Sequence, residues 1–166
     1  MAVQARQHPQ QQAITALVRQ WEARRRWSLV LRWLPRSLTP GLLIGLAAAF
    51  ISRTVPALTN THVLLITAAG MAAGALLLLA TVLLRPRSLV ESAQRFDLRF
   101  GLYERVSTAI ELLGGRIKGD PGLAAHQVSD ALATAQQVDH RARLPYFSDW
   151  REWLALALVA VMLAVV

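Results

Sequence analysis

The sequence of 166 residues contains no cysteine. This absence excludes disulfide bonds, thiolate catalysis and cysteine-ligated zinc or iron–sulfur sites. Charge is missing as well from the longest apolar run, since residues 63–84 include no Asp, Glu, Lys or Arg. Ionisable groups inside a membrane segment mark proton relays and substrate pathways. Their absence from the centre of each apolar run speaks against a transporter, and we expect no enzymatic activity.

Three apolar runs are present: residues 42–51, 63–84 and 153–166. A hydrocarbon core about 30 Å thick needs about 20 apolar residues of helix, which residues 63–84 supply. The last run is too short to span, and we therefore expect this chain to be the N-terminal part of a longer polypeptide. The prediction is an all-α integral membrane protein with a two-span hairpin, a third and truncated span, and a small cytoplasmic helical segment.

Basic residues are distributed unevenly along the chain. Residues 1–37 contain seven Arg against one Glu, residues 52–62 contain only Arg53, and residues 85–152 carry ten basic against nine acidic groups. Short loops rich in Lys and Arg stay in the cytoplasm. We therefore expect a multi-pass protein of the inner (plasma) membrane with a cytoplasmic N-terminus. Interfacial tryptophans agree with this topology: Trp27, Trp33, Trp150 and Trp153.

This topology divides the chain into four segments. They are a basic amphipathic segment (1–37), a transmembrane hairpin (38–84), a cytoplasmic helical segment (85–150) and an incomplete third span (151–166). In the first segment, Ile14, Leu17, Val18 and Trp21 recur at helical spacing, which suits a helix lying on an anionic leaflet. The alternative is a topology signal with no lipid-specific role. No nucleic-acid-binding motif accompanies the arginines, and we expect no nucleic-acid partner.

The first span has two possible beginnings. Thr39 as a cap and Pro40 in the first helical position make a good helix start, which we favour. The alternative is a start near Leu29 with a kink at Pro35. Small residues in both spans, Gly41-x-x-x-Gly45 and Gly70-x-x-x-Gly74, predict close packing of the hairpin in preference to a homodimer.

Three helices are predicted between residues 88 and 138. The first starts at the capping box Ser88-x-x-Glu91 and stops at Gly101. The second starts at Leu102 and is closed by Gly114-Gly115, and the third starts at Asp120-Pro121. Together these helices predict a small cluster on the cytoplasmic side.

A resemblance to a known group of proteins lies in this segment. Residues 93–112 read AQRFDLRFGLYERVSTAIEL, and Gln127-Val-Ser-Asp130-Ala131 and Val138-Asp139 follow. The chain from about residue 30 onward resembles the N-terminal region of large bacterial membrane proteins of uncharacterised function. The resemblance implies two spans, a helical cytoplasmic insert, a third span and a long extracytoplasmic remainder, and it implies no functional residue.

Two histidines are candidate ligands. His62, at the outer end of the second span, has the residue type of a haem or chlorin ligand, but we favour a plain interfacial histidine. His126 and Asp130 have an i, i+4 spacing that suits a metal, but two ligands do not make a site, and we favour a hydrogen-bonded surface pair. We assign no metal, cofactor or catalytic residue.

The charged residues of the insert have two interpretations. Asp97, Arg99, Glu104, Arg105 and Glu111 form either a solvated helix face or a docking surface for a partner. Ser107 and Thr108 lack the His/Asp arrangement of a nucleophile. The favoured function is a non-enzymatic membrane anchor or assembly subunit whose cytoplasmic helices contact a protein. The alternative is an accessory subunit of an electron-transfer or light-harvesting complex.

The membrane assignment predicts how the protein behaves in extraction. Alkaline carbonate removes proteins that are bound only at a membrane surface, whereas a helix with 22 uncharged residues stays in the hydrocarbon. We expect the natural protein to remain in the membrane pellet, as measured by immunoblotting. Release into the supernatant would contradict the assignment of residues 63–84 to lipid.

Overall fold

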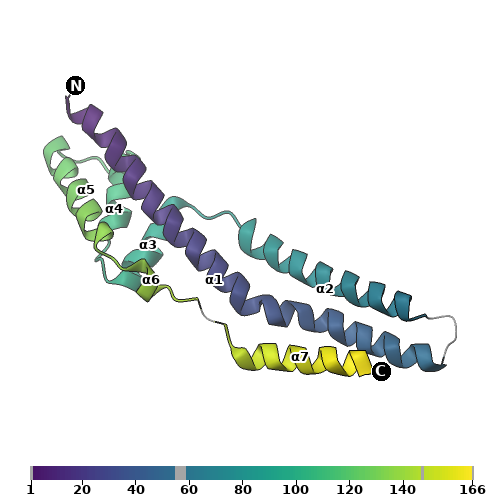
Figure 1. The fold of residues 1–166 in the computed structure, drawn as a ribbon. Helices are drawn as coiled ribbons and strands as arrows, with labels where there is room; N and C mark the ends of the chain where they lie inside the picture. Colours follow the sequence, from purple (N-terminus) through teal and green to yellow (C-terminus); the bar gives the residue numbers. More distant parts are fainter. Residues whose placement is uncertain (1, 55–58, 147, 166) are drawn as a thin grey trace. The chain divides into compact units, whose positions relative to one another are not determined.

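The computed structural model describes residues 2–54, 59–146 and 148–165, and the side chains of residues 9–53 in the first of these ranges. This part of the chain is all-helical, with no strand (Figure 1). The helices are α1 (Ala2–Thr54), α2 (Asn60–Leu83), α3 (Leu89–Phe100), α4 (Arg105–Leu113), α5 (Pro121–Gln136), α6 (His140–Arg143) and α7 (Trp150–Val165). The prediction of an all-α fold is confirmed.

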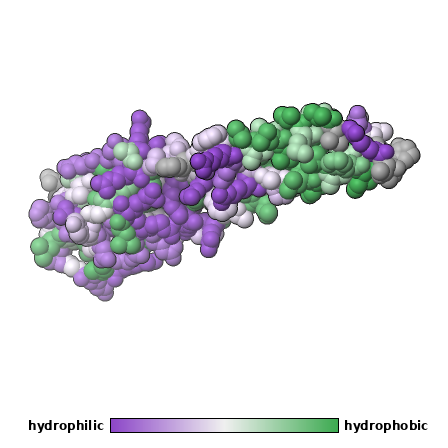
Figure 2. All heavy atoms as spheres, turned by 90° about the horizontal axis from the view of Figure 1, so that it is seen from below, coloured by the Kyte–Doolittle hydropathy of each residue, from purple (hydrophilic) through white to green (hydrophobic). Residues whose placement is uncertain are grey.

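The chain forms two units, and α1 contributes to both. The first, which we call the polar unit, consists of Met1–Arg25 and Pro86–Pro145. The second, the apolar unit, consists of Arg26–Arg85 and Tyr146–Val166. Apolar side chains cover the surface of the apolar unit, whereas charged and polar side chains dominate that of the polar unit (Figure 2).

Helix α1 overturns the favoured start of the first span. It continues through Pro35 and Pro40 without interruption. Proline removes a backbone N–H, so the carbonyl four residues earlier loses its helical donor, and a proline inside a helix normally kinks or breaks it. Here the carbonyls concerned are those of Leu31 and Arg36. Between the two prolines the Ser37 hydroxyl donates to the Leu34 carbonyl at 2.8 Å, and the Thr39 hydroxyl donates to that of Pro35 at 2.9 Å, so both side chains bond the preceding turn of the helix. Thr39 is therefore a residue inside the helix and not its cap.

In the apolar unit, α1 and α2 approach closely at glycines. A Cβ atom on Gly70 would lie 2.9 Å from the Cα of Gly41, and one on Gly41 would lie 2.5 Å from the carbonyl carbon of Gly70. Added Cβ atoms at Gly45 and Gly74 would likewise overlap Thr67 and Ser37. The predicted packing of the two small-residue motifs against each other is confirmed. Lipid supplies no hydrophobic drive between helices, so this close approach is what holds such a pair together.

Helix α7 packs against the same pair. Leu163 contacts a small cluster of Ala48, Ala49 and Val63. At the other end of α7, the Arg36 guanidinium pairs with Glu152, with Nε at 2.9 Å and Nη2 at 2.5 Å from Oε1, while Arg36 also lies over the Trp33 ring at 4.8 Å. Two helices, α1 and α2, are long and apolar enough to cross a membrane, and α7 has 16 residues.

The polar unit has one hydrophobic core, to which α1, α3, α4 and α5 all contribute. Trp21 of α1 is fully buried and meets the rings of Phe96 and Phe100 edge-on, at centroid distances of 5.6 and 5.1 Å. Ile14 and Val18 extend this contact along α1. The apolar face that was expected to lie on a leaflet is thus covered by protein.

Helix ends in the polar unit follow the sequence signals closely, with one exception. Ser88 accepts a hydrogen bond from the Glu91 amide, Gly101 ends α3 with a φ of 70°, and Asp120 caps α5. The exception is α4, which begins at Arg105 and not at Leu102. Tyr103 and Glu104 adopt left-handed backbone conformations that a helix cannot include.

The glycine contact between α1 and α2 gives a stability prediction. In an open helical position, Gly→Ala stabilises by about 1 kcal/mol. At Gly41 the added methyl group meets the backbone of Gly70 and Met71, so we expect Gly41→Ala to destabilise the apolar unit by about 1–3 kcal/mol. Unfolding in detergent, followed by circular dichroism, measures the change.

The matched control is Ala47→Leu, because Ala47 lies exposed on the same helix. We expect it to change the free energy of unfolding by less than about 0.5 kcal/mol. A stabilising effect of Gly41→Ala would show that the two helices do not touch at this point.

Candidate functional site: an exposed turn and a cationic cluster

The first candidate site comprises the end of α3 and its connection to α4, and we call it the exposed turn (residues 98–104). Leu98 and Tyr103 are 82 % and 88 % exposed, although both are large apolar residues. Between them, Leu102 points into the core and is 6 % exposed. The left-handed conformations of Tyr103 and Glu104 hold their side chains away from that core. Such conformations cost free energy and are found preferentially at functional sites.

Asp97 explains why the exposed turn keeps this conformation. Its carboxylate is buried and accepts hydrogen bonds from the Val106 amide at 3.2 Å, the Ser107 amide at 2.8 Å and the Ser107 hydroxyl at 2.7 Å. These amides are the first donors of α4, which its own N-cap, Glu104, does not satisfy with its side chain. An anion at a helix N-terminus also interacts favourably with the helix dipole. Asp97 is therefore a structural cap supplied by α3.

Asp97 thus corrects the interpretation of the five charged residues as one helix face. Arg99 and Glu104 are exposed, but Asp97 is 1 % exposed. Arg105 pairs instead with Asp130 at 3.3 Å and donates to the Thr134 hydroxyl at 3.2 Å. The surface left for a partner is Leu98, Arg99, Tyr103 and Glu104.

The second candidate site, the cationic cluster, consists of Arg25 and Arg87, which pair with Glu22, and of Arg95 and Arg99, whose charges act on Arg25. Glu22 is buried, and its Oε1 lies 2.8 Å from Nη1 of Arg87 and 3.6 Å from Nη1 of Arg25. Within the described part of the chain, that Arg25 nitrogen is buried and makes no hydrogen bond. Arg95, Arg87 and Arg99 all lie close enough to act electrostatically on Arg25.

The surroundings of Arg25 in the cationic cluster disfavour the charged form of its guanidinium group. Burial lowers the pKa of Arg25, the positive charge of Arg95 lowers it further, and Glu22 partly opposes both effects. Arg87 and Arg99 act in the same direction as Arg95. The guanidinium nevertheless stays charged at physiological pH, because arginine does not lose its proton in proteins. The Arg25 guanidinium thus experiences the charges of three other arginines and one carboxylate.

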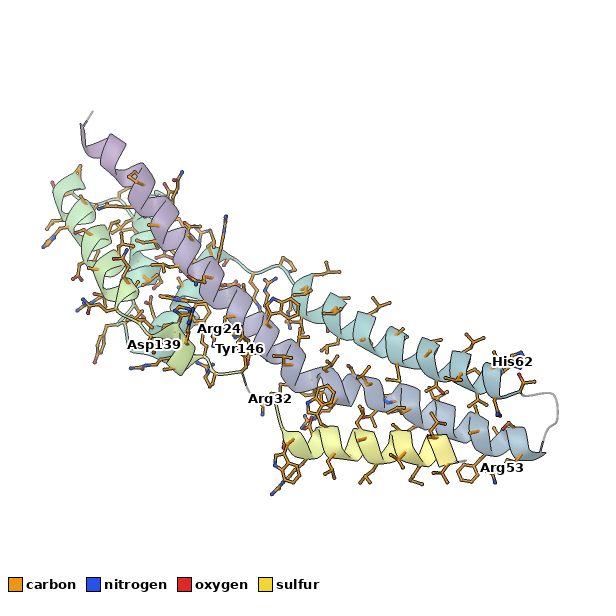
Figure 3. The ribbon with its side chains drawn as sticks, viewed as in Figure 1. Arg24, Arg32, Arg53, His62, Asp139 and Tyr146 are labelled. Atoms are coloured by element: carbon orange, nitrogen blue, oxygen red, sulfur yellow. The ribbon has the colours of Figure 1, made fainter. Side chains whose placement is uncertain are left out.

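Other arginines of the polar unit are used structurally. Arg24 donates through Nε to the Leu144 carbonyl at 2.9 Å, just beyond the end of α6. Asp139 caps the start of α6, and hydrogen bonds from the Ala142 and Arg141 amides lower the pKa of its carboxyl group. Arg24 and Asp139 are labelled in Figure 3. These contacts stabilise the short helix α6, which the periodicity of the sequence did not predict.

The two candidate histidines lie in different units. His62 lies in the first turn of α2 (Figure 3), where its Nδ1 accepts the Thr59 amide at 3.3 Å. The same nitrogen lies 2.8 Å from the Thr59 hydroxyl oxygen, so the ring and Thr59 together form a capping box at the start of α2. Asp130 pairs with Arg105, and among the described residues no hydrogen bond or ion pair joins Asp130 to His126, so the predicted surface pair is not formed.

A cavity of about 490 Å³ lies in the apolar unit among α1, α2 and α7. It is lined by apolar side chains together with Ser52, Asn60 and Thr67. The Ser52 hydroxyl already donates to the Ala49 carbonyl at 2.7 Å, and that of Thr67 to the Val63 carbonyl at 2.7 Å. Both hydroxyl groups therefore donate to backbone carbonyls of their own helices. Among the described residues, no three His, Asp or Glu side chains form a metal-binding group.

Comparison with known proteins adds no relative. No family model, curated protein or solved structure matches this chain. Sequence reasoning missed the cationic cluster because it read the arginines as topology signals, although Glu22, the one acid among seven arginines in residues 1–37, was a local sign of it.

The role of Asp97 is testable. Asp97→Ala removes the acceptor of three hydrogen bonds and leaves two buried amides without partners. We expect the polar unit to lose about 2–4 kcal/mol of stability in urea unfolding, with faster hydrogen exchange at the Val106 and Ser107 amides.

Asp130→Ala is the control, since it removes an exposed ion pair that is worth less than about 1 kcal/mol. Equal effects of the two substitutions would show that the buried cap does not stabilise the turn.

Proposed function

We propose that the chain is a non-enzymatic membrane anchor or assembly subunit whose polar unit binds a protein partner. The observation that carries the proposal is the exposed turn, which presents Leu98 and Tyr103 to solvent on a structurally supported backbone. Tyrosine is among the residues that contribute most binding energy at protein interfaces. Exposed apolar groups rimmed by charge are typical of such surfaces, and here Arg99 and Glu104 supply the charge.

The apolar unit supports the anchoring part of this proposal. In the most apolar stretch of 18 residues in α2, only 11 % is buried. Four leucines of this helix are each more than 60 % exposed: Leu64, Leu65, Leu76 and Leu77. A helix in the core of a water-soluble protein would bury such residues. Lipid is the solvent in which this surface is stable.

We further propose an orientation with the N-terminus and the polar unit in the cytoplasm of a bacterial cell, and an inner-membrane location. The excess of arginine before Gly41, and Arg85 and Arg87 after α2, support it. In this arrangement α7 is a third span leading outward, and Trp150 and Trp153 lie at its cytoplasmic interface. The resemblance to the N-terminal region of large bacterial membrane proteins fits the same topology.

The partner is tested by photocrosslinking in native membranes. A photoreactive residue in place of Arg99 or Glu104 should capture one specific protein, because both positions border the exposed turn. The double variant Leu98→Ser/Tyr103→Ser should reduce its recovery at least tenfold, which corresponds to about 1.4 kcal/mol of binding free energy.

Leu123→Ser is the matched control, since Leu123 is 72 % exposed on α5 of the same unit. We expect it to leave the recovery of the partner unchanged. Capture of no specific protein, or equal loss with the control, would count against the exposed turn as the docking surface.

A further inference from the structure

The cationic cluster carries more positive charge than the protein neutralises. The guanidinium groups of Arg25 and Arg87 pair with the carboxylate of Glu22, and the charges of Arg95 and Arg99 act on Arg25 as well. Glu22 Oε1 lies 2.8 Å from Arg87, whereas its contact with Arg25 is longer, at 3.6 Å. Three cations and one carboxylate thus act on the Arg25 guanidinium.

Burial makes this excess costly. The side chains of Arg25 and Arg87 are 21 % and 19 % exposed, so water screens them less than it would at an open surface. Partly buried charges are stable when they are paired and hydrogen-bonded. Nη1 of Arg25 is buried and makes no hydrogen bond within the described residues, so this N–H group is an unused hydrogen-bond donor of the cluster.

Arg95 and Arg99 complete the arrangement from α3. Both are exposed, so an anion can reach the cluster from solvent on their side. Arg99 makes one long hydrogen bond, at 3.4 Å, to the Arg143 carbonyl. Guanidinium groups bind phosphate through two parallel N–H donors, which makes several arginines around one point a good phosphate site.

The position of these residues along the chain indicates the source of the phosphate. Arg25 precedes Trp27 by two residues, and Trp27 and Trp33 are 52 % and 45 % exposed, as expected of rings in the headgroup layer. Arg87 follows Leu83, the last residue of α2, by four residues. Basic residues that closely flank membrane helices attract anionic lipids.

We propose that the cationic cluster of Arg25, Arg87, Arg95 and Arg99 binds the phosphate group of an anionic lipid headgroup. This inference rests on the proposed membrane location. It differs from the surface-lying helix expected from the sequence, because the contact is made by arginines of three segments and not by the apolar face of Ile14, Val18 and Trp21, which is buried in protein.

The test uses the full chain in nanodiscs and, by native mass spectrometry, in detergent with added lipid. We expect phosphatidylglycerol to be retained at least tenfold more tightly than phosphatidylcholine. The variant Arg95→Gln/Arg99→Gln should reduce this preference by roughly tenfold or more, because each arginine near an anionic surface contributes severalfold to binding. Both positions are exposed, so the fold should persist, as checked by circular dichroism.

The control variant, Arg116→Gln/Lys118→Gln, removes the same charge from the exposed connection between α4 and α5. It should keep the lipid preference. An equal loss in both variants would overturn the site, since the effect would then follow net charge alone. No preference between the two lipids in protein that has inserted would overturn the inference but not the membrane anchor.

Two further outcomes are decisive. Inorganic phosphate that displaces phosphatidylglycerol at equal concentration would show that the cluster binds a free anion, and would overturn the assignment to lipid. Failure to insert into either nanodisc would overturn the anchor and the lipid site together.

Discussion

The continuity of the α1 hydrogen-bond ladder is the constraint on which the rest of the structure depends. One helix of 53 residues provides Trp21 to the core of the polar unit and Gly41 to the helix contact of the apolar unit. The apolar residues that make α1 a candidate membrane-spanning helix lie in its second half, whereas its first half belongs to the polar unit. The helix continues through Pro35 and Pro40, and between them the hydroxyls of Ser37 and Thr39 donate to carbonyls of the preceding turn.

Different forces stabilise the packing within each of the two units. In the polar unit, aromatic rings from α1 and α3 exclude water, and burial of apolar area drives the packing. In the apolar unit, glycines allow the backbones of α1 and α2 to approach closely, so that dispersion contacts act between the two helices. In the same unit, Arg26 donates a hydrogen bond to the Leu83 carbonyl at the end of α2, at 2.9 Å.

Buried charge in the polar unit is used in two contrasting ways. Asp97 is fully satisfied by the first amides of α4, and it stabilises a turn whose left-handed residues would otherwise be costly. The cationic cluster is the opposite case, since two arginines pair with the carboxylate of Glu22 and, among the described residues, a buried Arg25 nitrogen makes no hydrogen bond. A satisfied buried charge supports structure, whereas an excess of one sign is an indication of binding.

The sequence by itself determined the features that depend on neighbouring residues. Ser88, Gly101 and Asp120 mark helix ends because capping and left-handed glycine act over three or four residues, and the paired glycine motifs predicted the α1–α2 contact because both faces were readable from spacing. Tertiary structure decided the start of α4, the burial of Trp21 and the gathering of the arginines. Each of these depends on residues far apart in the chain, such as Glu22 and Arg87, which only folding brings within hydrogen-bonding distance.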